Sequence, residues 1–454
     1  MSLSSRKAVV VAGVLTADAA LHVYWSTGAT WPASDHRSLS QAVLGGQAPF
    51  TPGVVLPLAA LLLTAAGIVY GRARRGAEGW LGRLLQAGTL ALAAGLLARA
   101  LVGIVWACGV GVEPGGTFYW LNLAVYTPLC LALGGVVVAI AREGRAGRAW
   151  PRRVALGLPL LLVAGLLSLA YGYQPAEQRD YRPGEGSQYV DTPVARFHYV
   201  RQGAGSPVVL LSPGMGWTFA WREQAAALAR EHTVYTVDLP GQGFTELRDR
   251  DFRFDLDGMT GAVHAFLDAV GVSRAALAGN SWSGGWALAY AQRHPERVSH
   301  LLLLAASGLD EPDPWSWEIL KLPVLGELLT KAGSGRSAMT AAASSLFHNT
   351  DRVTADVAES FWAPNTFADN LRSIYELERG LDWRMTDMAL SRTVQPALII
   401  WGADDSVLPV AQAATFGRRL PAAQVHVLDG CGHALTLDCP DQVTTLMREF
   451  LRER

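Results

Sequence analysis

The chain has 454 residues, which is long enough for more than one domain. Half of the residues are hydrophobic and only 17% are charged, and the mean hydropathy of +0.20 is high for a wholly soluble protein. With a formal net charge of −1 there is no basic excess, so we expect no nucleic-acid partner. The four cysteines contain no Cys-x-x-Cys pair, which argues against a disulfide-built scaffold and a zinc site.

The apolar excess lies before about Tyr173. Crossing a bilayer as a helix takes about 20 mostly apolar residues, and five segments meet that need: 8–25, 53–70, 84–107, 118–141 and 154–172. The first segment has the basic start of a secretory signal, at Arg6 and Lys7. Its aromatic end, His22-Val-Tyr-Trp25, is typical of a retained helix at a membrane interface. We therefore predict a transmembrane region of about five helices over residues 1–172.

The arginines predict the orientation of these segments. Basic residues precede the first segment and fill the loops at 72–83 and 142–153, whereas the alternate loops hold only Arg37. The positive-inside rule then places the N-terminus in the cytoplasm. Five spans deliver everything after Gly172 to the outer side, and one span fewer would reverse this. Because the composition is typical of a GC-rich bacterium, we expect a multi-pass protein of the bacterial plasma membrane with an extracytoplasmic C-terminal domain.

Residues 1–141 resemble an uncharacterised family of four-helix bacterial membrane proteins. The matching features are Leu21-His-Val-Tyr-Trp25, Arg99-Ala100 and Tyr119-Trp-Leu-Asn-Leu-Ala-Val-Tyr-Thr-Pro128. The resemblance implies a fold and no activity. His22, Arg99 and Asn122 are polar groups at or inside apolar segments, where polarity is costly and often functional. Interfacial snorkelling or hydrogen bonding between helices would also explain them.

Residues 173–193 are polar, contain Pro and Gly, and read as a linker. From Val194 onward, short apolar runs alternate with helical patterns. The predicted strands are 196–200, 208–211, 234–237, 275–278, 301–304, 397–401 and 424–428, and the predicted helices are 220–230, 256–270, 286–293, 410–420 and 442–451. Near-continuous apolar strands alternating with helices indicate a mostly parallel sheet covered on both faces. We predict one such α/β domain over residues 194–454.

The alternation stops at about 309–392, and we interpret this segment as a largely helical cap. It carries five prominent aromatic residues, Trp315, Trp317, Phe361, Trp362 and Phe367. A cap here would cover the carboxyl ends of the strands, where open α/β sheets place their ligands. Each aromatic residue could face that ligand or pack inside the cap's own core.

The stretch Gly279-Asn-Ser281-Trp-Ser283-Gly-Gly285 joins a predicted strand to a predicted helix. A serine at a sharp turn between small residues is typical of a nucleophile elbow. Both Ser281 and Ser283 are candidates for the nucleophile. A serine that merely caps the following helix would be the structural alternative.

A serine hydroxyl needs a base, and the base needs an acid that orients it. Asp404 and Asp405 follow one later strand, and His433 follows the next. The order Ser, Asp, His is that of α/β-hydrolases, and the chain resembles that superfamily from about residue 194 to the C-terminus.

The resemblance selects among the candidates. His294-Pro-Glu-Arg-Val298 follows the elbow as in the family, with Pro295 at the usual distance from Ser281, so Ser281 takes the nucleophile position. Ser283 then stands where the family has glycine, which predicts a strained or unusual backbone at that residue. The family pattern Gly-x-x-Asp-x-x-x-Pro selects Asp405 as the acid, leaving Asp404 as a solvent-facing neighbour.

The same resemblance implies an oxyanion hole made of two backbone N–H groups. One is that of Trp282, directly after the nucleophile. The other is that of Met215, in the turn Ser212-Pro-Gly-Met-Gly-Trp217, where Pro213 replaces the usual histidine. We interpret the turn Asp238-Leu-Pro-Gly-Gln-Gly-Phe-Thr245 as structural.

Cys431 and Cys439 bracket His433. They would form a disulfide if the domain faces an oxidising compartment. Two separate thiols, packed as small hydrophobic groups, are the alternative.

These observations predict a membrane-tethered serine hydrolase, with Ser281, His433 and Asp405 cleaving an apolar carboxylic ester. The expected partners are a small apolar acyl substrate and the lipid bilayer. No metal or organic cofactor is implied, and the sequence predicts no particular oligomeric state. Carbon–carbon bond hydrolases of the family that the chain resembles often carry an aromatic residue after the histidine. Ala434 stands there instead, which weakens that alternative. A non-catalytic sensor or ligand-binding protein is the alternative from another class.

Overall fold

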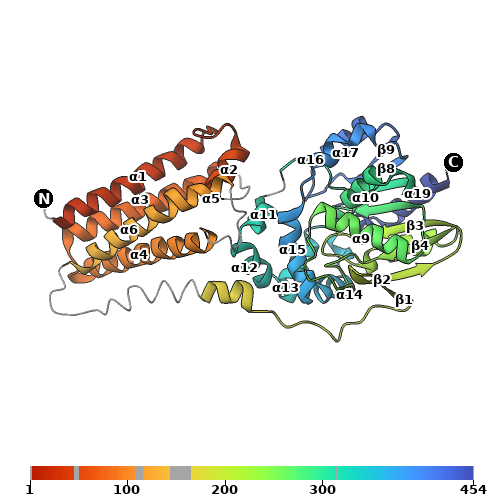
Figure 1. The fold of residues 1–454 in the computed structure, drawn as a ribbon, viewed down its shortest axis with the longest axis horizontal. Coiled ribbons are helices and arrows are strands. Elements are labelled where there is room, and N and C mark those ends of the chain that lie inside the picture. Colours follow the sequence, from red (N-terminus) through yellow and green to blue (C-terminus); the bar gives the residue numbers. More distant parts are fainter. Residues whose placement is uncertain (1–2, 45–50, 108–115, 144–164, 313–314, 453–454) are drawn as a thin grey trace. The chain divides into compact units, whose positions relative to one another are not determined.

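The computed structural model describes residues 3–44, 51–107, 116–143, 165–312 and 315–452. These residues form two compact units (Figure 1). The first contains the chain up to Tyr173 together with Leu322–Leu328, and the second contains Gln174–Lys321 and the chain from Leu329 onward.

The first unit is built from helices. They are α1 (Leu3–Trp25), α2 (His36–Leu44), α3 (Pro52–Arg75), α4 (Gly79–Ala107), α5 (Thr117–Leu121), the π-helical turn η1 (Asn122–Tyr126) and α6 (Thr127–Arg142). Helix α1 packs against α3, and α4 packs against α6 (Figure 1). Four helices are long and apolar enough to cross a membrane: α1, α3, α4 and the α5–η1–α6 segment. The first four predicted spans are thus confirmed as long apolar helices.

The fifth predicted span falls largely outside the described residues, because 154–164 are not described. Its last part contains the π-helical turn η2 (Ser168–Gly172). The fifth crossing therefore stays a prediction.

Small and larger aliphatic side chains together fill the centre of the four-helix unit. Ala8, Ala66 and Ala93 are buried there among valine and leucine residues. Large apolar side chains also point outward, and Leu61 and Leu84 are 64% and 62% exposed. Small residues let helices approach closely, and outward leucines suit contact with lipid tails. Helices that are apolar both toward the bundle centre and on its outside make the N-terminal unit a membrane-associated region.

The second unit is built on a nine-stranded sheet. Its strands are β1 (Ser187–Asp191), β2 (Ala195–Gln202), β3 (Ser206–Leu211), β4 (His232–Val237), β5 (Glu246–Leu247), β6 (Ala275–Asn280), β7 (Val298–Leu304), β8 (Ala397–Gly402) and β9 (Ala423–Leu428). Their order is β1-β2-β4-β3-β6-β7-β8-β9, with β5 beside β2. Along this order, every neighbouring pair in β4-β3-β6-β7-β8-β9 is parallel. Strand β2 pairs antiparallel with β1, β4 and β5. The predicted mostly parallel sheet is confirmed.

The predicted linker at 173–193 is partly wrong. Ser187–Asp191 forms the edge strand β1, which pairs antiparallel with β2. Tyr181 packs edge-on against Trp217, with ring centroids 6.0 Å apart, and the backbone N–H of Gln178 donates to Thr366 Oγ1. The sequence did not indicate this strand because its residues are mostly polar, and an edge strand has little apolar surface to bury.

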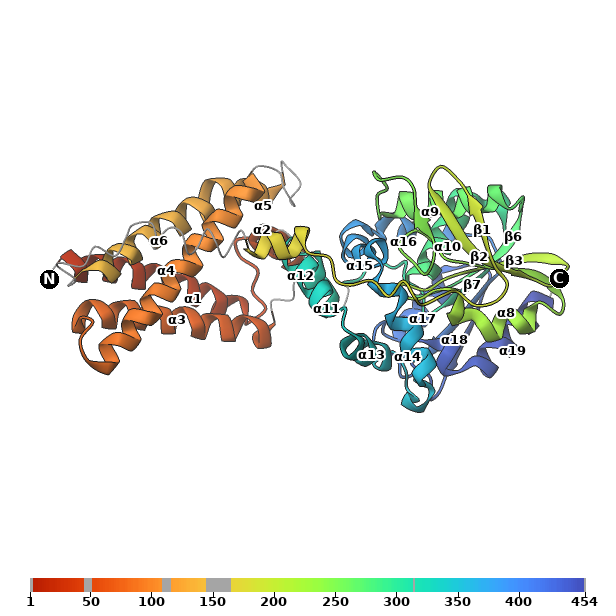
Figure 2. The ribbon, with the colours of Figure 1, turned by 90° about the horizontal axis from the view of Figure 1, so that it is seen from below.

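Helices cover both faces of the sheet. They are η3 (Thr218–Trp221), α8 (Arg222–Leu228), α9 (Leu256–Ala269), α10 (Trp282–Arg293), η4 (Pro295–Arg297), α17 (Ala411–Arg419), α18 (Leu435–Asp438) and α19 (Pro440–Arg452). Figure 2 shows α8 and α19 on one face, with α9 and α10 on the other. Every residue of β4, β6 and β8 is buried between these layers. The strands are therefore apolar on both faces, as a doubly covered sheet requires.

The cap is inserted between β7 and β8, as the sequence predicts. Its elements are α11 (Trp315–Glu318), η5 (Ile319–Lys321), α12 (Leu325–Ala332), α13 (Arg336–Ser344), η6 (Thr350–Arg352), α14 (Ala355–Trp362), η7 (Pro364–Thr366), α15 (Ala368–Gly380), α16 (Arg384–Met388) and η8 (Leu390–Arg392). Strands β6, β8 and β9 end at the loops that carry Ser281, Asp405 and His433. The carboxyl edge of the sheet thus places the three predicted residues.

Candidate active site

Ser281 occupies a strained turn between β6 and α10. Its φ angle is 62°, a left-handed conformation that residues with a side chain rarely adopt. The backbone holds it there, because Ser281 N donates to Leu304 O at 3.0 Å and Ser281 O accepts from Ser307 N at 3.1 Å. A Cβ atom on Gly279 would lie 2.3 Å from the backbone of Ser283. The small residue at 279 is therefore a steric requirement of the elbow.

Ser283 differs from the expectation of strained backbone. It lies within helix α10, and the positive φ angle in this turn belongs to Ser281. Its side chain is fully buried, accepts a hydrogen bond from Asn280 N at 3.0 Å and donates to Leu211 O at 3.1 Å. The hydroxyl thus ties β6 to β3 and is not exposed to a ligand.

Asp405 and His433 form a buried pair. Oδ2 of Asp405 lies 2.8 Å from Nδ1 of His433, and the aspartate side chain is fully buried. Its other oxygen, Oδ1, accepts from the backbone N–H groups of Val407 and Leu408 at 2.8 and 2.9 Å. With both oxygens engaged, the carboxylate fixes the ring of His433 so that Nε2 is the remaining nitrogen. Asp404 is half-exposed and lies beside His348, as expected of a solvent-facing neighbour.

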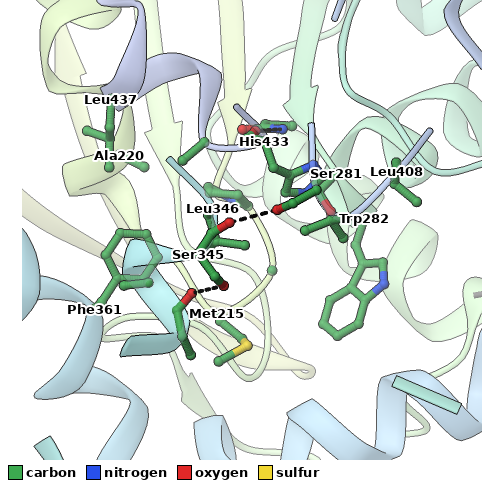
Figure 3. Close-up of a pocket in the computed structure, with 18 of the residues that line it drawn as sticks. Met215, Ala220, Ser281, Trp282, Ser345, Leu346, Phe361, Leu408, His433 and Leu437 are labelled. Carbon is green, nitrogen blue, oxygen red and sulfur yellow. Dashed lines mark hydrogen bonds between the residues drawn. The ribbon is translucent and has the colours of Figure 1, made fainter. Parts of the chain in front are cut away.

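Ser281 and His433 line one cavity of about 340 Å³. Figure 3 shows these two residues beside each other, while Phe361 lies apart from them. The described residues contain no hydrogen bond between the serine hydroxyl and the imidazole, a common state of such pairs before a substrate binds. Most of the lining residues have apolar side chains: Pro213, Met215, Ala220, Trp282, Trp317, Met339, Ala342, Ala343, Leu346, Phe361, Val407, Leu408, Ala434 and Leu437.

Two of the five aromatic cap residues reach this cavity, Trp317 and Phe361. Trp362 instead donates its ring N–H to Ser334 O, and Phe367 packs against Phe244. The side chain of Trp315 lies outside the described residues. The cap aromatics therefore divide between the cavity and internal packing.

Met215 and Trp282 also line the cavity. Neither of their N–H groups donates a hydrogen bond to another described residue. Met215 has a φ angle of 57°, so this loop, like the elbow, is held in an unfavourable conformation. A Cβ atom on Gly214 would lie 2.3 Å from the ring of Trp282. That close approach explains why Gly214 is kept although Pro213 replaces histidine.

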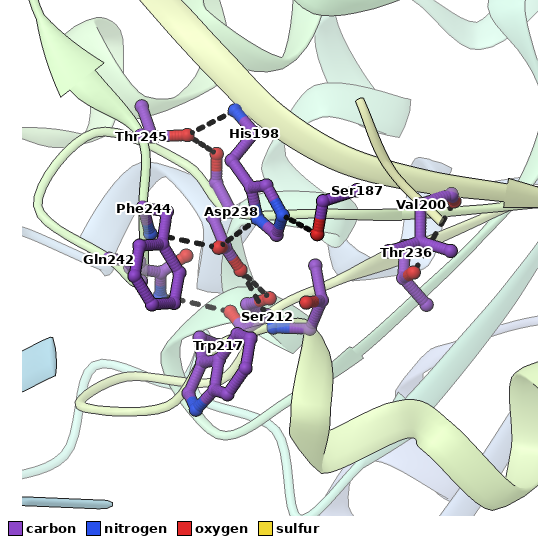
Figure 4. A network of polar contacts seen from close by, with 12 residues as sticks. Ser187, His198, Val200, Ser212, Trp217, Thr236, Asp238, Gln242, Phe244 and Thr245 are labelled. Carbon is purple, nitrogen blue, oxygen red and sulfur yellow. Dashed lines mark hydrogen bonds and ion pairs between the residues drawn. The ribbon is translucent and has the colours of Figure 1, made fainter. Parts of the chain in front are cut away.

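A buried polar network, overlooked in the sequence, holds the Met215 loop (Figure 4). At its centre Asp238, fully buried, accepts from Ser212 Oγ at 2.8 Å, from Thr218 N at 2.7 Å and from Phe244 N at 3.1 Å. Its Oδ2 lies 2.7 Å from Nδ1 of His198, which is also fully buried. Asp238 thereby fixes both ends of the loop from Ser212 to Thr218.

Two side-chain amides bind three carbonyl groups of this loop. Gln242 Nε2 donates to Ser212 O and Pro213 O at 2.9 and 2.8 Å. Asn365 Nδ2, from the cap, donates to Met215 O at 2.6 Å. The turn Asp238–Thr245 is the sequence feature that could have indicated this network. We interpret it as structural, and it also aligns the two ends of the Met215 loop.

The loop that carries His433 is closed by a disulfide. Cys431 and Cys439 are bonded, with their Cα atoms 6.0 Å apart. Asp438, inside this ring, accepts from Gly432 N at 2.7 Å and from His348 N at 2.8 Å. The imidazole is therefore positioned from both sides, by Asp405 and by its own loop.

Charged groups are rare at the cavity. Among the described residues that line it, Glu378 is the one carboxylate and none is lysine or arginine. The described residues also contain no group of three or more His, Cys, Asp or Glu side chains that could hold a metal ion. The cavity thus brings a serine and a histidine together within a largely apolar wall.

Comparison with known proteins agrees with this geometry. Residues 207–440, just over half of the chain, match the alpha/beta hydrolase fold family, and residues 15–138 match a family of proteins of unknown function (DUF3995). The cis-3-alkyl-4-alkyloxetan-2-one decarboxylase of Shewanella oneidensis is 28% identical over 57% of this chain and 86% of its own length. The 2-hydroxy-6-oxo-2,4-heptadienoate hydrolase of Pseudomonas putida is 28% identical over 55% and 90%.

Among solved structures, the carboxylesterase CesB of Bacillus subtilis has the same fold. Its TM-score is 0.52 at 19% identity, over 64% of this chain and 96% of that one. The family match covers most of β3, the strands from β4 to β9, the elbow and the His433 loop. The chain belongs to the alpha/beta hydrolase fold family.

Proposed function

We propose that this protein is a membrane-tethered serine hydrolase that cleaves an apolar carboxylic ester. One observation carries the proposal: a serine in a strained elbow and an aspartate-paired histidine open on the same apolar cavity. A positioned base is what a serine hydroxyl needs to become a nucleophile. The apolar wall favours an uncharged acyl group.

The reaction would use the residues in these roles. His433 accepts the proton of Ser281 as Oγ bonds to the acyl carbon. The resulting oxyanion is held by the backbone N–H groups of Met215 and Trp282. Collapse of this intermediate breaks the ester C–O bond, and His433 gives its proton to the departing alcohol. Water then attacks the acyl-enzyme in the same manner and restores Ser281, while Asp405 stabilises the imidazolium at both stages.

A carbon–carbon bond hydrolase is the second candidate, because a relative is named for a heptadienoate substrate. Such a substrate carries a carboxylate. Burying a charge without a partner is costly, and no lysine or arginine lines the cavity among the described residues. The cavity therefore favours a neutral ester over a dienoate.

The extracytoplasmic location of this domain belongs to the same proposal. The disulfide beside His433 supports it, since such bonds persist in oxidising compartments. A C-terminal alkaline phosphatase fusion should be active and a C-terminal green fluorescent protein fusion dark. The reverse pattern would place the domain in the cytoplasm.

Labelling by a fluorophosphonate probe tests the enzyme assignment. We expect the full chain to be labelled and to hydrolyse p-nitrophenyl octanoate, and Ser281→Ala to lose both properties. Ser187→Ala, which removes another hydroxyl next to a histidine, is the matched control and should keep both. An unlabelled but folded wild-type protein would favour a ligand-binding role without turnover.

A further inference from the structure

Arg99 lies deep in an apolar helix of the membrane-associated unit. It stands eight residues before the end of α4, which ends at Ala107. At a rise of 1.5 Å per residue, that is about 12 Å inside the helix end. A charged side chain at such a position is costly, and it commonly marks a binding site or pathway.

Neutral groups hold the guanidinium in place. Nη1 of Arg99 donates to Asn122 Oδ1 at 3.1 Å, and the guanidinium carbon lies 4.8 Å from the ring centre of Trp106. Asn122 is fully buried and is fixed by its own bond to Gly103 O at 2.8 Å. Thr127 Oγ1 donates to the same Asn122 oxygen at 3.1 Å. Arg99 is thus fastened inside the bundle, which snorkelling to water would not require.

The backbone is shaped around this group. Asn122 begins the π-helical turn η1, and such turns are frequent at functional sites. A Cβ atom on Gly103 would lie 2.0 Å from Thr127 Oγ1 and 3.0 Å from Arg99 Nη1. The glycine therefore leaves the space in which the arginine, asparagine and threonine meet.

The guanidinium has unused donors. It carries five N–H groups, and within the described residues it makes one hydrogen bond and no ion pair with a carboxylate. Asn122 and Thr127 cannot neutralise its charge. A planar fork with free donors suits two oxygens of one carboxylate or phosphate.

We propose that Arg99, Asn122 and Trp106 form a binding site in the membrane for the anionic oxygen group of a lipid. Two sources share this chemistry: the carboxylate of a free fatty acid and the phosphate of an anionic phospholipid. The site shares no residue with the Ser281 cavity, and the proposal holds whether or not that cavity hydrolyses esters.

The test measures lipid binding by the purified full chain in phosphatidylcholine nanodiscs. The probes are labelled oleate, dioleoyl phosphatidylglycerol and, as an uncharged analogue, oleyl alcohol. We expect Arg99→Gln to weaken binding of at least one anionic probe about tenfold, as loss of a charge-assisted pair predicts. Oleyl alcohol binding should not change. Loss of oleate alone assigns a carboxylate ligand, and loss of phosphatidylglycerol alone assigns a phosphate.

Two variants keep the test sharp. Arg74→Gln removes an exposed arginine near the end of α3 and should bind all probes like the wild type. Asn122→Asp leaves Arg99 in place but gives it an internal carboxylate, so it should also lose the anionic probe. Equal binding of both anionic probes by wild type, Arg99→Gln and Asn122→Asp would overturn the proposal. An equal loss of oleyl alcohol would do the same.

Discussion

The hydrolase unit contains two buried His–Asp pairs of nearly the same geometry. Nδ1 of His433 lies 2.8 Å from Asp405, and Nδ1 of His198 lies 2.7 Å from Asp238. The environment of the second ring nitrogen, Nε2, differs between the two pairs. Nε2 of His198 is taken by Ser187 Oγ at 2.9 Å (Figure 4), whereas His433 opens on the cavity.

Three residue types in contact therefore do not define an active site. Ser187, His198 and Asp238 reproduce the order of groups in a triad, but Ser187 lies on an edge strand and its hydroxyl donates to Gly184 O. Ser281 stands in a strained elbow and lines an apolar cavity, whereas Ser187 has no positive φ angle and does not line that cavity. Access and a poised nucleophile distinguish the proposed catalytic pair from the supporting one.

Replacing each of the two serines with alanine should give the largest difference in activity. Ser281→Ala should lower kcat at least about 10⁴-fold, because it removes the group that bonds to the acyl carbon. Ser187→Ala should lower kcat less than threefold on the same p-nitrophenyl ester, an allowance for measurement scatter and small shifts. Similar losses in both variants would mean that the second set takes part in the reaction.

The two aspartates should fail in different ways. Asp405→Asn should lower kcat about 10³- to 10⁴-fold with little change in melting temperature, because the ring of His433 loses its orientation. Asp238→Asn should lower the free energy of unfolding by about 3–5 kcal/mol, since it breaks a buried pair on which several donors converge. Urea unfolding beside kinetics separates these effects, and an unchanged stability of Asp238→Asn would refute the supporting role.

The network around Asp238 should also affect catalysis through the Met215 loop. Gln242→Ala removes two hydrogen bonds to that loop and should lower kcat about tenfold with KM nearly constant, because it shifts an oxyanion donor and not the acyl wall. Gln395, which is buried and donates its side-chain amide to Pro295 O away from the cavity, gives a control variant of the same type. An effect on KM alone would contradict this reading.

Removing the disulfide should affect the loop that carries His433 and leave the His198–Asp238 pair unchanged. The bond closes a ring over a sequence separation of 8 residues, so replacing both cysteines with serine should lower the free energy of unfolding by about 2–3 kcal/mol. Activity near room temperature should fall only modestly, since Asp405 still holds the ring. Wild-type protein treated with a reductant should behave like the double variant.

The smallest effect concerns a carboxylate outside both pairs. Hydrogen bonds from Arg452, then from Arg448, lower the pKa of Glu231 to about 2. A depressed pKa stabilises the fold above the unfolded pKa of about 4.3, and this contribution is lost as the pH falls towards 2. The melting temperature of Glu231→Gln should lie slightly below that of the wild type at pH 7. The gap should close between pH 4 and 2 and narrow in salt.

Much of the fold could be predicted because burial leaves its pattern in the sequence. Apolar runs marked four long helices and seven strands, and the cap showed as a break in their alternation. The short edge strand β1 was missed because its residues are mostly polar. Ser281, Asp405 and His433 were predicted from motifs that follow separate strands, and the structure brings these three loops to one edge of the sheet.

Only the tertiary structure decided which polar residues act as supports. Ser283 and Ser281 are alike in the sequence, but the packing of β3 against β6 buries one hydroxyl and leaves the other at the cavity. Likewise, His198 and Asp238 are 40 residues apart, and their spacing does not predict that their side chains form a hydrogen-bonded pair. Local sequence determines where a chain turns and which side chains avoid water. Contacts between distant segments determine which of the remaining polar groups stay free to react.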